Sequence, residues 1–556
     1  MYSHQRAEGR VRTRLEYLVL HFRFLCLGAV CLAGISAGTP LLAQSAASAP
    51  QSPAASETSR AEKLLREDRA GEALSLLLEA YRAGPDDFRV CHLVGLAYTK
   101  MQQFEKAAEF YRKALRLNPG FVPARKNLAT VLWFSNHKVE AEREFLSIAK
   151  ALPGDPVPHF YLGSMEYERR QFSKARSHFA RAGDLAFNNP EALPMVLETY
   201  LASRDLSFPD RVMRQLEQAV TPDPELAFQC GALFGRYGLY SRAILMFEKI
   251  KSIYADRYSL FLNLGTAQLE ARQYKAAAES LEIAAASSSA KAEAFLLLGE
   301  AHNKEGNPEK AYSAYTRAIE MEPKSEGVYM ALAGFAAAHG NKDFALKTLA
   351  QGLERIPDST KLLMQQGTIW GLQLYLDEAE QSFRQASLSD PVAALPLLAL
   401  GLTQLQAGKL AAAADTFRQA ARYAPNDFRP EYFYALALAR SGGRGDPARR
   451  KEIISSLEKA IALNPDDAES RVALGQTHQA AGQLDLAAKE LQKALVLAPA
   501  NLTALYQLSA IYRKQGKTEA AQQMQRKFEE VKAKTSQEEE EERKALVQIM
   551  KTVSQK

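Results

Sequence analysis

Few stretches of this 556-residue chain place reactive side chains at the spacing that chemistry requires. The segment Gly34–Gly38 matches the Gly-x-Ser-x-Gly pattern of a hydrolase nucleophile elbow, but it lies in an apolar run with no strand before it, so we interpret it as coincidence. Gly516–Thr518 resembles the end of a phosphate-binding loop, yet Ile511 stands where the first glycine belongs. The sequence contains no His-Glu-x-x-His and no Cys-x-x-Cys. We therefore expect no enzyme, no cofactor and no metal site.

Short helical patterns occupy most of the chain instead. Segment 292–325 shows the unit most clearly: Phe295 and Gly299 lie four residues apart on one face of a first helix. A Gly-Asn-Pro turn leads to a second helix that carries Ala311 on its apolar face and ends before Pro323, which cannot continue a helix. Small residues stand where the two helices must approach closely. The segment therefore predicts a helical hairpin.

The hairpin pattern recurs every 34 residues. Stepping from residue 292 gives starts at 54, 88, 122, 156, 190, 224, 258, 292, 326, 360, 394 and 428, and then at 468 and 502 after a six-residue insertion. Residue identities that hold this register over most of the chain indicate an array of repeats. Alanine occupies the position of Ala311 in twelve of the fourteen units: Ala73, Ala107, Ala141, Ala175, Ala243, Ala277, Ala311, Ala345, Ala379, Ala413, Ala487 and Ala521.

This spacing and its small residues resemble the tetratricopeptide repeat family. The resemblance implies an all-α fold, a right-handed superhelical solenoid of about fourteen 34-residue helix-turn-helix repeats over residues 54–535, with a charged tail or helix at 536–556. A single helix pair cannot bury its apolar face alone, so each unit needs its neighbours. The family also implies a binding activity toward other proteins or peptide segments.

Two places depart from the regular pattern. Pro209 takes the alanine position of the fifth unit, and Ser441–Pro447 is a loop inserted between the helices of the twelfth. That loop contains an Arg-Gly-Asp tripeptide, to which we attach little weight because three residues recur by chance. Cys91 and Cys230 lie 139 residues apart, too far for a disulfide in a solenoid, and we interpret them as small buried apolar side chains.

In tetratricopeptide repeats the fifth residue of the first helix usually faces the binding groove, so the resemblance assigns groove residues by register. None of those assigned is charged, which suits a segment with hydrophobic anchors. Alternatively, these side chains are core. A clamp for a terminal carboxylate needs Lys and Asn, and Lys126 with Asn127 is the nearest match. The candidate partner-binding residues are Phe160, Phe228, Leu262, Leu296, Met330, Met364, Leu398 and Tyr432, and Pro194, Val472 and Tyr506 complete the register.

The amino end has the layout of a secretory signal. Residues 1–23 are polar and basic, Phe24–Gly38 is apolar and uncharged, and small residues follow. We expect a signal peptide over 1–43 and a flexible linker rich in Ala, Ser and Pro over 44–53. An uncleaved membrane anchor is the alternative and would be the chain's contact with a membrane. The expected location is the periplasm of a bacterium, with inner-membrane anchoring or secretion as alternatives.

The net charge of +6 gives no sign of a nucleic-acid partner. The first 43 residues contain five arginines and two glutamates, a surplus of three, which leaves +3 for the rest of the chain. A nucleic-acid binder concentrates Lys and Arg on one face, and here the signs are interspersed. We therefore expect a protein-interaction scaffold of the bacterial cell envelope. The alternative is an accessory component of an envelope machine for exopolysaccharide secretion, pilus assembly or outer-membrane biogenesis.

Overall fold

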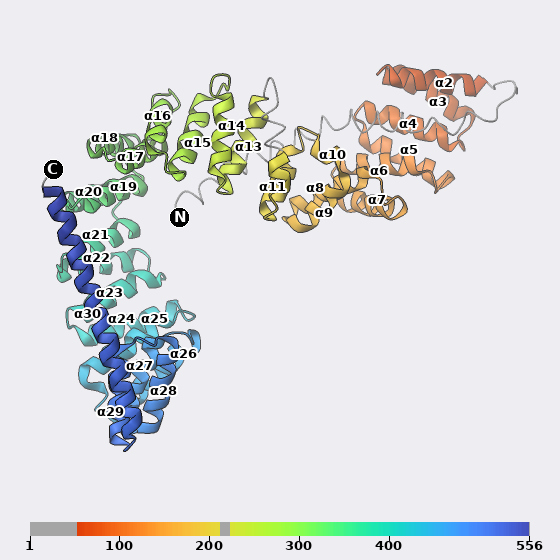
Figure 1. The fold of residues 1–556 in the computed structure, drawn as a ribbon. Coiled ribbons are helices and arrows are strands. Elements are labelled where there is room, and N and C mark those ends of the chain that lie inside the picture. Colours follow the sequence, from red (N-terminus) through yellow and green to blue (C-terminus); the bar gives the residue numbers. More distant parts are fainter. Residues whose placement is uncertain (1–52, 212–222, 555–556) are drawn as a thin grey trace. The chain divides into compact units, whose positions relative to one another are not determined.

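The computed structural model describes the backbone of residues 53–211 and 223–554, and the side chains of residues 57–211 and 223–537. Within these residues the chain forms helices and no strand (Figure 1). The predicted signal peptide and the linker up to residue 52 lie outside the described part of the chain. Contacts divide the chain into two compact units, Met1–Ala290 and Lys291–Lys556, and each is described by itself.

The helices follow one another as pairs in both units. The first unit contains α2 (Pro53–Arg66), α3 (Ala70–Ala83), α4 (Phe88–Lys100), α5 (Phe104–Leu117), α6 (Val122–Phe134), α7 (Lys138–Ala151), α8 (Pro156–Glu168), α9 (Phe172–Ala182), α10 (Asp184–Phe187), α11 (Leu193–Ala202), α13 (Pro224–Arg236), α14 (Tyr240–Ile250), α15 (Arg257–Glu270) and α16 (Tyr274–Ala285). The second contains α17 (Ala292–Glu305), α18 (Pro308–Met321), α19 (Glu326–Ala338), α20 (Lys342–Arg355), α21 (Thr360–Leu372), α22 (Leu376–Ser389), α23 (Ala394–Gln406), α24 (Leu410–Tyr423), α25 (Phe428–Leu438), the π-helical turn η1 (Ala439–Gly443), α26 (Pro447–Leu463), α27 (Ala468–Ala480), α28 (Leu484–Leu497), α29 (Leu502–Lys514) and α30 (Thr518–Ser554).

These bounds confirm the predicted repeat register. Of the fourteen predicted starts, eleven coincide with the first residue of a helix. The other three, at 54, 190 and 258, differ from it by at most three residues. In the fifth repeat the described part of the second helix covers residues 207–211. The prediction of an all-α solenoid of 34-residue repeats is therefore confirmed.

A close glycine contact joins the two helices within many repeats. A Cβ added to Gly299 would lie 2.7 Å from Cε1 of Tyr315, much closer than two carbons can approach. Only glycine lets the tyrosine ring lie directly against the backbone of the first helix, so the glycine fixes how the hairpin closes. The same approach joins Gly95 to Tyr111, Gly163 to Phe179, Gly231 to Phe247, Gly367 to Phe383 and Gly401 to Phe417.

The repeated alanine of the second helix also packs at the contact between the two helices of a repeat. All twelve alanines at this position are buried; Ala521 is 3% exposed and the others 0%. Ala311 belongs to the apolar core that also contains Tyr315, Tyr329 and Leu332. No space remains for a larger side chain there.

We expect Ala311→Leu to overpack this core and to destabilise the second unit by about 1–3 kcal/mol. Because each repeat touches only its neighbours, hydrogen exchange should quicken over residues 292–350, while α28 and α29 keep their protection. Ala338→Leu, at an exposed position of the neighbouring repeat, is the control and should change stability by less than about 0.5 kcal/mol. Equal loss of protection throughout the unit would contradict repeat-by-repeat packing.

The two irregular repeats keep their packing by local changes. In the fifth, Phe208 is buried with its ring centroid 5.0 Å from that of Phe187 and 5.0 Å from that of Tyr200. Pro209 lies in the first turn of its helix, where the missing N–H costs no hydrogen bond. In the twelfth, Asp446 of the Arg-Gly-Asp tripeptide caps α26 by accepting from the backbone N–H of Ala448 at 2.9 Å. That carboxylate therefore has a structural role.

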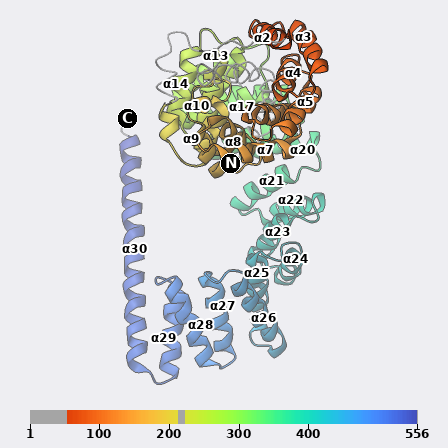
Figure 2. The ribbon, with the colours of Figure 1, turned by 90° about the vertical axis from the view of Figure 1, so that its right-hand side faces the viewer.

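The last repeat ends in a helix of 37 residues, α30. Its first part packs on α29, where the ring of Phe528 lies 6.0 Å from that of Tyr506 between centroids. From Lys532 to Gln537 every side chain is exposed. Figure 2 shows α30 continuing as one helix well beyond α29.

Candidate protein-binding face

The first helices of neighbouring repeats contact one another in the second unit. α17 touches α19, α19 touches α21, α21 touches α23, and α23 touches α25. Gln365 of α21 donates from Nε2 to the backbone oxygen of Met330 of α19 at 3.2 Å, which ties two of these helices directly. The five helices therefore form a layer, and residues at equivalent positions recur along it.

The predicted groove residues of the second unit are mostly half-buried in this layer. Leu296, Met330, Met364 and Tyr432 are partly covered, and Leu398 is buried at 4% exposure. Leu296 and Met330 rest on the apolar core around Tyr329. Each of these four side chains is packed against its neighbours and remains partly accessible to solvent, as a binding site for an apolar segment requires.

Two further leucines on α23 widen this surface, and the register argument missed them. Leu395 is 60% and Leu402 39% exposed. With Leu398 they fall at i, i+3 and i+7 and so lie on one side of the helix. The available signal was the composition of α23, ALPLLALGLTQLQ, because a helix with six leucines cannot bury them all. We call Leu296, Met330, Met364, Leu395, Leu398, Leu402 and Tyr432 together the first-helix face.

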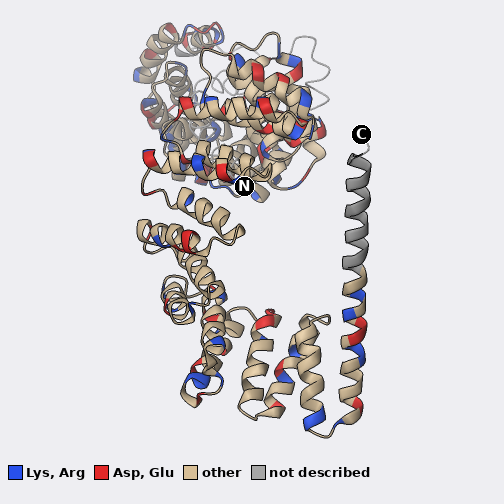
Figure 3. Cartoon of the chain, turned by 90° about the vertical axis from the view of Figure 1, so that its left-hand side faces the viewer, with Lys and Arg blue, Asp and Glu red and all other residues tan. Residues whose placement is uncertain are grey.

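The middle of this face is electrically neutral. The helices α19, α21 and α23 contain two charged residues between them, Glu326 and Lys361. These two form an ion pair at 2.9 Å, and Glu326 also accepts from the Ser359 hydroxyl at 2.7 Å. Elsewhere basic and acidic residues are interspersed along the described helices (Figure 3). A charged partner segment would lose water on this face and find no counter-charge, so the face favours an apolar one.

The predicted groove residues of the first unit are more deeply packed. Phe160 is 2% and Phe228 9% exposed, and the Phe228 ring stacks on Tyr254 at 4.6 Å between centroids. Leu262 is half-buried. The same register position thus serves the core in the fourth and sixth repeats and remains accessible in the eighth to tenth.

Lys126 and Asn127 are both engaged within the first unit. Lys126 forms an ion pair with Asp155, which also caps α8 by accepting from the N–H of Val157 at 3.1 Å. The side-chain amide of Asn127 lies 3.0 Å from Nε2 of His92. Burial lowers the pKa of His92 to about 4, so this ring is neutral near pH 7 and accepts the amide hydrogen bond. Neither side chain is placed to hold a terminal carboxylate.

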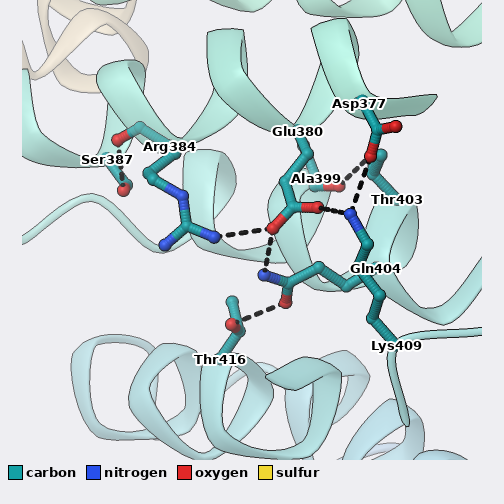
Figure 4. A network of polar contacts seen from close by, with 9 residues as sticks. All are labelled: Asp377, Glu380, Arg384, Ser387, Ala399, Thr403, Gln404, Lys409 and Thr416. Atoms are coloured by element: carbon teal, nitrogen blue, oxygen red, sulfur yellow. Dashed lines mark hydrogen bonds and ion pairs between the residues drawn. The ribbon is translucent and has the colours of Figure 1, made fainter. Parts of the chain in front are cut away.

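A polar network joins α22, α23 and α24 (Figure 4). Glu380 accepts from Lys409 at 2.8 Å, from Arg384 at 2.6 Å and from the Gln404 amide at 3.0 Å. Gln404 is 1% exposed and its oxygen accepts from Thr416 at 2.8 Å, so both ends of the buried amide are satisfied. The network links three consecutive helices and holds α23 in place.

The pKa of Glu380 reflects this environment. Burial alone would raise it, but the hydrogen bonds from Lys409, Gln404 and Arg384 outweigh burial and lower the pKa to about 2. A carboxyl with a lowered pKa stabilises the fold above its ordinary value of 4.5, and this contribution is lost as pH falls from 4.5 toward 2.

We expect Glu380→Gln to make the free energy of unfolding less dependent on pH below about pH 5. The wild type should lose about 1–2 kcal/mol more than the variant between pH 5 and pH 2. The full pKa shift would imply more, but Lys409 and Arg384 are about half exposed and solvent screens them. Urea melts at each pH measure this difference, with Glu378→Gln, an exposed neighbour, as the control. Parallel curves for wild type and Glu380→Gln would contradict the role of the network.

The structure accounts for the cysteines and for Gly516 as parts of the fold. Cys91 and Cys230 are buried free thiols, and burial raises the pKa of Cys230 to about 12, which keeps it a thiol at neutral pH. Gly516 has a φ of +73° in the turn between α29 and α30. Among the described residues no cluster of three or more His, Cys, Asp or Glu side chains is suited to a metal ion. Of the helices described, none combines the length and apolar character needed to cross a membrane.

Stacked helix pairs, with first helices in contact from one repeat to the next between α17 and α25, define the class of helical-repeat proteins. Family models of the tetratricopeptide repeat match residues 89–121, 262–326, 302–365, 376–442, 454–501 and 472–526. The chain is a tetratricopeptide repeat protein.

Comparisons with individual proteins give more distant likenesses. The Protein CTR9 homolog of Arabidopsis thaliana is 23% identical over 477 residues, which cover 82% of this chain and 41% of that protein, so the chain spans about two fifths of its relative. Yeast Tom70 is 14% identical with a TM-score of 0.33, and the match covers 83% of this chain and 96% of Tom70. YrrB, a tetratricopeptide repeat protein with an unusual peptide-binding site, is 20% identical with a TM-score of 0.31 over 35% of this chain and 97% of YrrB. The fold assignment therefore rests on the helix pairs and the repeat models.

Proposed function

We propose that this protein is an interaction scaffold whose second unit binds an apolar segment of a partner protein along the first-helix face. One observation carries the proposal. The Leu and Met side chains of this face are partly accessible, and the only charged residues of α19, α21 and α23 are one Glu and one Lys that pair with each other. An extended or helical segment with hydrophobic anchors matches this chemistry. Most of the binding free energy should come from a few such anchors near the centre of the face.

Site-specific photo-crosslinking tests this proposal in the protein's source cells. A crosslinking amino acid placed at Met330, Met364 or Leu395 should yield the same partner band from all three positions. The matched control is Gln351, an exposed residue of α20 on the second-helix side. Equal crosslinking from Gln351 and from the three face positions would overturn the assignment of the face.

We further propose that the scaffold works outside the cytoplasm, in the cell envelope of a bacterium. The basic, apolar and small-residue order of residues 1–43 supports this location. The protein would then serve as an adaptor in the periplasm, or as an accessory part of an envelope assembly or export machine. A reporter that is active only in the cytoplasm, fused after Lys556, should remain inactive; an active reporter would refute export.

A further inference from the structure

The loop inserted into the twelfth repeat gathers positive charge, unlike the interspersed charges elsewhere in the chain. Between residues 440 and 451 there are five basic residues and one acidic residue, Asp446, a surplus of four. Residues 44–556 as a whole carry +3, so the remainder of that part is at −1. We call the five basic residues together the basic loop: Arg440, Arg444, Arg449, Arg450 and Lys451.

Arg444 is partly buried without an acidic partner among the described residues. Its Nη2 donates to Oε1 of Gln476 in α27 at 2.9 Å, and its Nε is buried with no hydrogen-bond partner in the described chain. Burial lowers the pKa of Arg444, because no negative charge compensates for the loss of water. A guanidinium in this position favours a bound anion, which would supply the missing counter-charge.

Three other side chains of the basic loop also lack a counter-charge. Arg440, Arg450 and Lys451 form no ion pair within the described residues. Arg450 donates from Nε to the backbone oxygen of Arg444 at 2.7 Å and from Nη2 to that of Gly445 at 3.1 Å, which holds its guanidinium against the loop. Arg440 and Lys451 are exposed. Four of the five basic side chains are therefore available to an anion.

The acidic residues nearest in sequence do not neutralise these four cations. Asp446 caps α26 and lies 3.8 Å from Nε of Arg449. Glu452 accepts from the Tyr434 hydroxyl and lies 3.5 Å from Arg418 of α24. Both carboxylates are thus engaged with other groups.

The start of α26 makes the positive charge more unfavourable in the free protein. This helix begins at Pro447 and has no acidic residue in its first turn. Arg449, Arg450 and Lys451 all fall within its first five residues, at the end where the helix dipole is positive and disfavours cations. The stability of the fold therefore gives no reason for so many cations here, whereas the binding of an anion does.

We propose that the basic loop binds an acidic segment of a partner protein. Arginine presents a planar fork of donors that matches a carboxylate, and three of the four available side chains are arginines. They are anchored at separate points, Arg444 on α27 and Arg450 on the loop itself, so they suit several carboxylates along one chain better than one small anion. Residues 439–452 contain no aromatic side chain on which a base could stack, which favours an acidic peptide over single-stranded nucleic acid. This site is independent of the apolar segment proposed for the first-helix face.

Fluorescence anisotropy of the full chain with a labelled octa-glutamate peptide tests the proposal. The wild-type Kd should rise at least about tenfold between 50 and 300 mM salt. We expect Arg444→Gln, and separately the double variant Arg440→Gln with Lys451→Gln, to raise the Kd at least about fivefold, because each removes counter-charges of the peptide. The control is the double variant Lys347→Gln with Arg355→Gln, which removes the same types of charge from exposed positions of α20 and should change the Kd less than about twofold.

Four outcomes would overturn the proposal: octa-glutamate fails to bind at 50 mM salt, neither loop variant weakens binding, the control double variant weakens it as much as the loop variants, or an oligothymidine binds more tightly through the same residues. The last outcome would assign the loop to nucleic acid. Because Arg440 and Lys451 are exposed, their double variant tests the loop without disturbing the fold. Met330→Ser should leave octa-glutamate binding unchanged, and Arg444→Gln should leave binding at the first-helix face unchanged, so that failure of one proposal is separable from failure of the other.

Discussion

Truncation of Phe417 to alanine is expected to destabilise the second unit by about 3–5 kcal/mol, more than any surface change in the chain. Phe417 is 0% exposed, and its ring lies so close to Gly401 that a Cβ there would be 2.6 Å from Cε1 of the ring. It also stacks on Phe433 at 5.4 Å between centroids. One ring thus holds the two helices of the eleventh repeat together and joins them to the twelfth. Its removal leaves a cavity that rigid helices on three sides cannot fill.

The same helix supplies a matched control. Tyr423 is also an aromatic residue of α24 but is 43% exposed, and Tyr423→Ala should cost less than about 1 kcal/mol. Denaturant unfolding measures both variants, and hydrogen exchange shows where the loss falls. For Phe417→Ala the exchange should quicken in α23, α24 and α25 first. Similar costs for the two variants would contradict the assignment of Phe417 to the core between repeats.

The repeat register was predictable because local contacts determine it. Gly299 and Tyr315 meet within one hairpin, and the buried Ala311 lies beside them, so the residue types that recur in the sequence are the ones that touch in the structure. A pattern of short-range contacts can be read without knowing how distant repeats are arranged. The division between Ala290 and Lys291 had no comparable signal, because the 34-residue spacing continues through it.

The accessibility of the candidate site was less predictable for the same reason. Register assigned Phe228 and Met330 to equivalent positions, yet Phe228 is covered by Tyr254 while Met330 is only partly covered. Exposure at this position depends on which side chains the neighbouring repeats contribute. The turn between α21 and α22 had a local signal, a leucine where the equivalent described turns carry glycine or a polar residue, but the left-handed φ of Leu374, +62°, is a backbone property that the sequence does not show.

Replacement of Leu395 by aspartate should abolish binding of an apolar peptide to the first-helix face while leaving the fold intact. Leu395 is 60% exposed and is the second residue of α23, where a carboxylate interacts favourably with the helix dipole, so stability should change by less than about 0.5 kcal/mol. In a complex the new charge would be buried against apolar side chains without a counter-ion. We expect the affinity to fall at least about a hundredfold, or roughly 2.7 kcal/mol.

Val139→Asp provides the control for this prediction. Val139 is 64% exposed and is likewise the second residue of its helix, α7, but it belongs to a second helix of the first unit. A peptide selected on the intact protein from a random display library serves as the probe, and calorimetry gives its affinity for each variant.

Because the middle of the face holds one internally paired Glu and Lys, the wild-type affinity should change less than about threefold between 50 and 500 mM salt. Equal affinities for Leu395→Asp and Val139→Asp, or a steep dependence on salt, would show that the peptide binds through charge elsewhere on the molecule.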